Sequence, residues 1–277
     1  MSLRDRMKGI LDLGKTVIRE YSADNGTLMA AAISYFIFLS LIPLLLLAIA
    51  VVGLLLGSPA NAERLIVGQF GQYAATPGTR GIIEQVVRGS SAATGIGIIA
   101  FLWSGTSVIV ILEMVLNQAW EVNQKRGFVA QRLLAIGVLI VLGALFGLSF
   151  GLTTAITAIR SLDVPIPGGL SWIWDLLGYL IPPIITILTF TLLYKVLPNT
   201  RVPWRSALIG GIFAGILWEI AKIGFSFYVT NIANYSRVYG SLAGVILLLL
   251  WIYYSSIITI LGAELSSVKV GRVSEQR

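Results

Sequence analysis

The chain has 277 residues, of which 56% are hydrophobic and only 12% are charged. A soluble domain carries about a quarter charged residues, so this composition indicates a protein embedded in a membrane. The chain has no cysteine and no histidine, which excludes disulfides, thiolate metal sites and histidine-dependent catalysis.

The first 24 residues predict an amphipathic helix with its cap. Apolar residues recur at helical spacing on one face of residues 3–21, and basic residues crowd the other face. This pattern is typical of a helix lying on the cytoplasmic leaflet of a membrane. A signal peptide is the alternative, because Ala48-Ile49-Ala50 imitates a cleavage site. The apolar run continues well beyond that site, which favours a retained first span.

Six apolar stretches follow, each long enough to cross about 30 Å of hydrocarbon as a helix. We expect spans at about 28–56, 92–114, 133–159, 172–196, 205–230 and 240–264. The sequence therefore predicts an all-α integral membrane protein with a six-helix domain over residues 25–266. An outside loop is expected at 57–91, with a short helix resting on the bundle, and a cytoplasmic tail at 267–277.

The basic residues set the orientation. On this map, 14 of the 20 lysines and arginines lie in the N-terminal segment, the second and fourth loops and the tail, and five lie in the other loops. The positive-inside rule then places both termini in the cytoplasm. The formal net charge of +7 is therefore a topology signal, and we expect no nucleic-acid partner.

The fifth span carries two charges near its middle. Wound as an α-helix, it has a polar stripe of Gly211, Gly215, Glu219, Lys222, Ser226 and Thr230. Its opposite face is apolar and consists of Leu208, Ile212, Ile216, Ile220, Ile223 and Phe227. Glu219 and Lys222 stand three residues apart, close enough to pair. A charge at this depth costs at least about 2.5–3.5 kcal/mol, so the polar stripe must face protein or water.

Two interpretations of that pair remain open. It is either part of a substrate pathway, as intramembrane charges often are, or a structural ion pair that pins helix packing.

The fourth span contains Pro182-Pro183, which removes two backbone donors. The carbonyls of Gly178 and Tyr179 then lack helical donors, and lipid supplies none. A kinked helix is one interpretation, and a discontinuous helix lining a cavity is the other. Dividing the spans three and three places Pro43 in the first span and Pro182-Pro183 in the fourth, at corresponding places of two halves that run in opposite directions, and interrupted helices at such places point to a transporter site. The predicted pathway consists of Glu219, Lys222, Gly215, Ser226, Gly178, Tyr179, Pro182, Pro183 and Pro43.

Other features favour structural interpretations. Glu113, Lys195 and Glu264 lie at cytoplasmic span ends, where solvation at the interface is inexpensive. Gly143, Gly147, Gly151 and Ala155 form a small-residue ridge that predicts close helix packing by the third span.

Several motifs resemble those of the YihY/BrkB family of bacterial inner-membrane proteins. They are Ser34-Tyr35-Phe36, Leu39-Ser40-Leu41-Ile42-Pro43-Leu44, Leu116-Asn117-Gln118-Ala119-Trp120, Tyr194-Lys195-Val196-Leu197-Pro198-Asn199, Trp218-Glu219, Tyr239-Gly240-Ser241 and Gly262-Ala263-Glu264-Leu265. The resemblance covers nearly the whole chain and implies a six-helix protein of the cell envelope. The family has also carried the labels ribonuclease BN and virulence factor, and neither label is a mechanism.

The ribonuclease label conflicts with the chemistry of this chain. RNA cleavage needs positioned acid–base groups or clustered metal ligands, whereas the carboxylates here are scattered and no nucleotide-binding motif is present. We therefore expect no enzyme activity, cofactor or metal. The sequence favours a transporter-like or lipid-handling protein of the bacterial inner membrane, with membrane lipids as partners. A non-transporting scaffold of an envelope complex, or a homo-oligomer, is the alternative.

Overall fold

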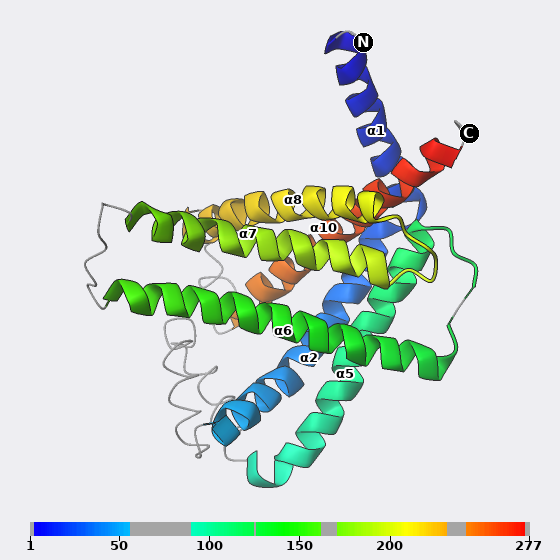
Figure 1. The fold of residues 1–277 in the computed structure, drawn as a ribbon. Helices are drawn as coiled ribbons and strands as arrows, with labels where there is room; N and C mark the ends of the chain where they lie inside the picture. The colour runs from blue at the N-terminus through cyan, green and yellow to red at the C-terminus, as the bar shows by residue number, and fades with distance from the viewer. Residues whose placement is uncertain (1–2, 56–89, 125, 162–170, 232–241, 275–277) are drawn as a thin grey trace.

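The computed structural model describes residues 3–55, 90–124, 126–161, 171–231 and 242–274, and throughout these ranges the regular structure is helical (Figure 1). The helices are α1 (Leu3–Ala23), α2 (Gly26–Leu55), α5 (Ser90–Ala119), α6 (Phe128–Ser161), α7 (Ser171–Val196), α8 (Trp204–Asn231) and α10 (Ala243–Ser274). The predicted all-α class is confirmed.

Four helical segments of the described chain are long and apolar enough to cross a membrane, namely Phe128–Ser149, Gly178–Val196, Trp204–Asn231 and Ala243–Val268. A bent pair formed by Leu11–Ala23 and Gly26–Leu41 raises this number to five. The count of six spans and the cytoplasmic position of both termini remain predictions. The expected loop 57–91 lies almost wholly outside the described residues, and α10 extends through most of the expected tail.

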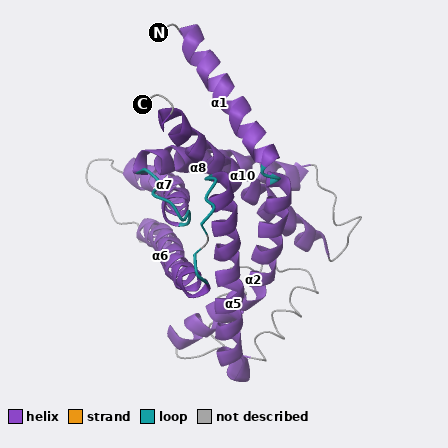
Figure 2. Cartoon of the chain, turned by 90° about the vertical axis from the view of Figure 1, so that its right-hand side faces the viewer, coloured by secondary structure: helices purple, strands orange, loops and turns teal. Residues whose placement is uncertain are grey.

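The helices meet at one end of the molecule and diverge from it. Helix α7 packs along α8, α2 packs along α5, and α10 contacts both α8 and α2. Helices α5, α7 and α10 finish, and α2, α6 and α8 begin, on the same side, at the right of Figure 1. Figure 2 shows the bundle from that side. We call this region the packed end.

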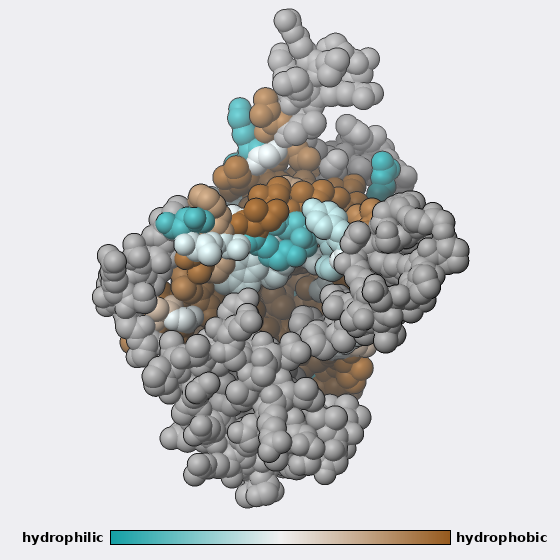
Figure 3. Space-filling view, turned by 90° about the vertical axis from the view of Figure 1, so that its left-hand side faces the viewer, coloured by the Kyte–Doolittle hydropathy of each residue, from teal (hydrophilic) through white to brown (hydrophobic). Residues whose placement is uncertain are grey.

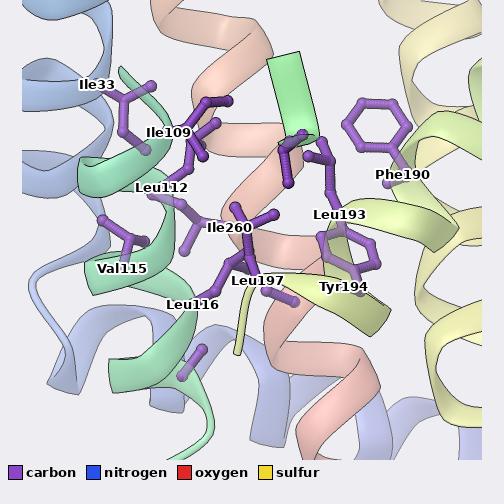
Figure 4. Packing of buried hydrophobic residues seen from close by; sticks show 14 of the residues in the cluster. Ile33, Ile109, Leu112, Val115, Leu116, Phe190, Leu193, Tyr194, Leu197 and Ile260 are labelled. Carbon is purple, nitrogen blue, oxygen red and sulfur yellow. The ribbon is translucent and has the colours of Figure 1, made fainter. Parts of the chain in front are cut away.

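The hydrophobic core lies at the packed end. Figure 4 shows Ile33 of α2, Leu116 of α5, Ile260 of α10 and Leu197, which follows α7, gathered in one cluster of buried side chains. The buried residues of α8 all fall between Ser206 and Gly215. Among the described side chains of 176–189, 216–231 and 242–251, none is buried. Helices α7, α8 and α10 are therefore tightly packed over one half of their length only.

Glycines allow the close approach of α8 to its neighbours. A Cβ added at Gly211 would lie 2.1 Å from Oγ1 of Thr191 and 2.8 Å from its backbone nitrogen, and one at Gly215 would lie 2.4 Å from Cγ1 of Ile187. A Cβ at Gly262 of α10 would lie 2.8 Å from Cβ of Ala214. Such small-residue contacts bring helix backbones together where lipid provides no hydrophobic driving force.

The glycine ridge of α6 behaves differently. A Cβ added at Gly143, Gly147 or Gly151 would meet nothing within 4 Å. The prediction that this ridge packs closely is therefore wrong for these three glycines within the described chain. The side chain of Ala155 is not described.

Helix α7 continues through Pro182-Pro183 without interruption. The expectation of a span broken at this point is therefore wrong, and the kinked or continuous helix is the correct alternative. A helix in a membrane tolerates proline where neighbouring groups satisfy the freed carbonyls. The carbonyls freed here are those of Gly178 and Tyr179, whereas the hydroxyl of Thr186 donates to a different carbonyl, that of Pro182, at 3.0 Å.

Helix α1 ends at a sharp bend before α2. Asn25 adopts φ 54°, the left-handed conformation that asparagine tolerates after a helix. A Cβ added at the next residue, Gly26, would lie 2.3 Å from the ring of Tyr21, so a larger residue there would displace that ring. The axes of α1 and α2 are bent by 65°. The predicted N-terminal helix is present, and it leaves the bundle at the packed end (Figure 1).

Candidate functional site

The polar stripe of α8 passes from the packed end into the open half of the bundle. Gly211 and Gly215 are buried against α7, Glu219 is partly buried, and Lys222, Ser226 and Thr230 are exposed. The opposite face behaves as the sequence predicts, since all six of its apolar side chains are exposed. We call the six polar-stripe residues, Gly211, Gly215, Glu219, Lys222, Ser226 and Thr230, the α8 stripe.

Glu219 and Lys222 form the ion pair that their spacing predicts. Nζ of Lys222 lies 2.7 Å from Oε2 of Glu219, and the two side chains are 42% and 29% exposed, respectively. The second carboxylate oxygen, Oε1 of Glu219, is buried and has no hydrogen-bond partner among the described residues. The pair therefore lies at the edge of the packed region, with unused hydrogen-bonding capacity.

The other predicted pathway residues are distributed unevenly. Tyr179 of α7 is exposed, Gly178, Pro182 and Pro183 are half-buried, and Ser226 is exposed. Gly215 faces Ile187 in a tight helix contact and does not border open space. The side chain of Pro43 is not described. Figure 3, from the side at which α7 begins, shows a hydrophilic group directly below a hydrophobic band, with residues of intermediate hydropathy beside it.

A second polar group, which sequence reasoning placed at the interface, is buried at the packed end. Glu113 of α5 is 1% exposed and pairs with Arg126 at 2.8 Å, between Oε1 and Nη1. Arg126 also donates to the carbonyls of Leu197 and Pro198, at 2.6 and 3.2 Å. These carbonyls follow α7, where helical donors are lacking. One guanidinium thus joins α5 to the end of α7.

Asparagines reinforce the same junction. The backbone N–H of Asn199 donates to Oδ1 of Asn117 at 2.6 Å, and its side-chain amide donates to the carbonyl of Gln124 at 3.0 Å. We call Glu113, Asn117, Arg126 and Asn199 the end clamp. Only Glu113 of this group is fully buried, and the other three residues are partly buried, so the end clamp joins α5 to the end of α7 at the edge of the core.

Two further residues of the same motifs are also held at the packed end. The hydroxyl of Tyr194 donates to the carbonyl of Thr259 on α10 at 2.8 Å, and Tyr194 is fully buried. Lys195 donates to the carbonyl of Val202 and lies over the ring of Trp204 at 5.1 Å. Glu264 of α10 is buried as well. The solvation expected of the Glu113 and Glu264 side chains is therefore wrong, because both are inside the bundle, while their position at the cytoplasmic ends of spans stays a prediction.

The end clamp was visible in the sequence only as separate motifs. Asn117 belongs to one motif and Asn199 to another, and 82 positions separate them. One signal in the sequence indicated that Glu113 has a distant partner. It is a single acidic residue in an apolar helix, and no basic residue stands three or four positions away.

The described part of the chain contains no set of side chains that could hold a catalytic metal ion. Groups of three or more His, Cys, Asp or Glu side chains that would hold an ion are absent from it. The polar groups instead pair with one another or with backbone carbonyls.

The chain is similar to bacterial membrane proteins over most of its length. It is 30% identical over 262 residues to the ribonuclease-like protein YfkH of Bacillus subtilis, covering 92% of this chain and 94% of that protein. It is 29% identical over 267 residues to a UPF0761 membrane protein of Pseudomonas aeruginosa, covering 95% of this chain and 64% of that one. A UPF0761 membrane protein of Nitrosospira multiformis is 31% identical over 271 residues, with 94% and 62% covered.

The chain thus spans less than two thirds of the length of these UPF0761 relatives. No solved structure matches it. The profile of the family described as virulence factor BrkB matches residues 17–276. This match confirms the resemblance carried by the sequence motifs: the chain belongs to the BrkB virulence factor family of membrane proteins.

Proposed function

We propose that this protein is a transporter-like or lipid-handling protein of the bacterial inner membrane, with a polar pathway along the second half of α8. One observation carries the proposal. The ion pair of Glu219 and Lys222 lies within a helix apolar enough to span a membrane, yet its side chains are 29% and 42% exposed. A purely structural pair in a membrane would be enclosed by protein, because lipid does not solvate charge.

The asymmetry of packing supports a pathway that opens away from the packed end. Beyond Gly215 the α8 stripe leaves the glycine contacts with α7, and its polar residues are partly buried at Glu219 and exposed from Lys222 onward. The end clamp meanwhile holds α5 and α7 together at the other end. A bundle that is locked at one end and loosely packed at the other suits a site with access from one side of the membrane.

The chemistry of the α8 stripe favours an amphipathic cargo. Glu219 and Lys222 together present one negative and one positive group at a partly exposed position. Exposed apolar residues, including Ile220 and Ile223, flank the pair on the same helix. A phospholipid, with a charged headgroup and apolar chains, matches both surfaces.

Cysteine labelling tests this proposal, because the native chain has no cysteine. Single-cysteine variants at Ser226, Gly178 and Tyr179 should react with a water-soluble thiol reagent in the membrane. Variants at Ile212 and Ile223, on the lipid face, should stay unreactive. Gly215 is unsuitable for substitution, since a Cβ there would lie 2.4 Å from Ile187. If all five positions are equally inert, the open half is dry, and the scaffold alternative replaces the pathway.

A further inference from the structure

Among the apolar residues of α1, Val17 faces the bundle, whereas Leu11 and Ile18 do not. Val17 is 5% exposed, and α1 contacts α10 and α2. Leu11 and Ile18 are 62% and 63% exposed. Seven residues separate these two, so they lie on nearly the same line of the helix, two turns apart. The chain thus leaves an apolar strip of α1 without a protein neighbour among the described residues.

Basic side chains border this strip. At about 100° per residue, Lys15 and Arg19 lie about 40° and 80° around the helix from Leu11. Both residues are exposed. Arg19 pairs with Glu20 at 2.9 Å, but that pair is at the surface and contributes little. The sequence of α1 holds five basic and three acidic residues. Apolar residues flanked by lysine and arginine are typical of helices that rest in an anionic lipid interface.

The bend before α2 gives α1 the necessary orientation. Helices that cross a membrane tilt by about 20° on average, and α1 is bent by 65° from the apolar start of α2. An α2 close to the membrane normal therefore places α1 nearer to the membrane plane. The left-handed Asn25 and the contact of Gly26 with Tyr21 hold that bend.

We propose that α1 is an anionic-phospholipid-binding element that lies in the headgroup layer beside the bundle. Leu11 and Ile18 insert below the headgroups, and Lys15 and Arg19 bind lipid phosphates. Charge complementarity selects this partner, since the exposed basic residues beside the strip favour an anionic surface over a neutral apolar one. The element is independent of the α8 pathway, and it would anchor the packed end whether or not that pathway carries a cargo.

Depth-dependent quenching tests the proposal on the full-length protein. Single cysteines at Leu11, Ile18 and Asp12 are labelled with an environment-sensitive fluorophore, and the protein is reconstituted into phosphatidylcholine bilayers with or without phosphatidylglycerol. Spin-labelled lipids then report contact with acyl chains. With phosphatidylglycerol, the labels at 11 and 18 should be quenched more strongly than the label at 12. In pure phosphatidylcholine that difference should shrink.

Charge variants supply the matched control. Each basic side chain near an anionic surface changes partitioning about fivefold. Lys15→Gln with Arg19→Gln should therefore weaken quenching at 11 and 18, whereas Asp12→Asn should not, and both variants should keep the parental unfolding temperature. Equal quenching of the labels at 11 and 12, or quenching that does not change when phosphatidylglycerol is added, would overturn the proposal. The labels at 11 and 18 could instead be shielded from the quencher to a degree that grows with the protein-to-lipid ratio and not with anionic lipid. That result would assign the strip to a protein partner.

Discussion

Two ion pairs in this bundle have opposite environments. Glu113 is 1% exposed, and its partner Arg126 is 20% exposed, whereas Lys222 and Glu219 are 42% and 29% exposed. Arg126 also satisfies carbonyls beyond the end of α7, so it serves two helices at once. The clamp pair therefore stabilises the fold, while the α8 pair is free to interact with other groups.

Removal of Arg126 should destabilise the protein more than removal of Lys222. Arg126→Met leaves Glu113 as an uncompensated buried carboxylate, which costs about 3–5 kcal/mol. Lys222→Met breaks a partly exposed pair, and in a water-accessible site this should cost about 1 kcal/mol or less. The midpoint of thermal unfolding in detergent micelles measures the difference.

The double variant Glu113→Gln with Arg126→Met provides the internal check. It should be more stable than Arg126→Met alone, because the buried charge is removed together with its partner. Equal unfolding midpoints for Arg126→Met and Lys222→Met would show that the end clamp contributes no more to stability than the α8 ion pair does.

For individual residues, contacts between positions close in the sequence could be predicted, and contacts between distant positions could not. Glu219 and Lys222 stand three residues apart on one helix, so their pairing follows from helix geometry alone. Glu113 finds its partner in Arg126, 13 residues away, and Arg126 binds a carbonyl 71 residues away. No local pattern contains those contacts, so their burial required the structure.

The elements themselves follow from hydropathy, but their contacts do not. Four of the expected spans fall within one helix each, and the spans 28–56 and 240–264 overlap α2 and α10 over most of their length, since apolar stretches of this length satisfy their backbone polar groups only as helices or barrels. Gly211 and Gly215 were assigned to a polar stripe, whereas the structure uses them to bring α7 and α8 together. A glycine suits either role, and the side chain opposite it decides which one applies.

Gly211→Ala should therefore destabilise the contact between α7 and α8. The added Cβ would lie 2.1 Å from Oγ1 of Thr191 and 3.0 Å from its Cα, so backbone must move. Overpacking of this kind costs about 1–3 kcal/mol. Gly224→Ala is the matched control on the same helix, because a Cβ there meets nothing within 4 Å.

The unfolding temperature of both variants separates packing from helix propensity. Alanine favours helix over glycine by about 1 kcal/mol, so Gly224→Ala should be neutral or stabilising while Gly211→Ala is destabilising. Stabilisation by both substitutions would mean that α7 and α8 do not approach this closely.

For the whole molecule, composition was sufficient to predict an all-helical membrane protein. The family motifs were sufficient to predict its relatives. The convergence of the helices on a packed end was not predictable, because it depends on contacts between segments far apart in sequence, such as Tyr194 with Thr259. Three of the family motifs meet there, since Asn117, Tyr194 and Asn199 all make hydrogen bonds at that end.

The purified protein should not cleave RNA with Mg²⁺ or Mn²⁺. The chain has no histidine, and its described part has no cluster of three metal-binding side chains. A gel assay with structured and unstructured RNA measures this, alongside Glu113→Gln and Glu219→Gln variants. Cleavage that follows wild-type protein through purification and disappears in a single carboxylate variant would contradict this expectation.

The most direct test of a bundle locked at one end and open at the other is the sidedness of thiol labelling on α8. Single cysteines at Ser206, buried at the packed end, and at Ser226, exposed in the open half, are treated with a membrane-impermeant reagent. Right-side-out and inside-out vesicles are compared. We predict that position 226 reacts only in right-side-out vesicles and that position 206 reacts in neither. Labelling of 226 from the cytoplasmic side alone, or of 206 more than 226, would contradict the account.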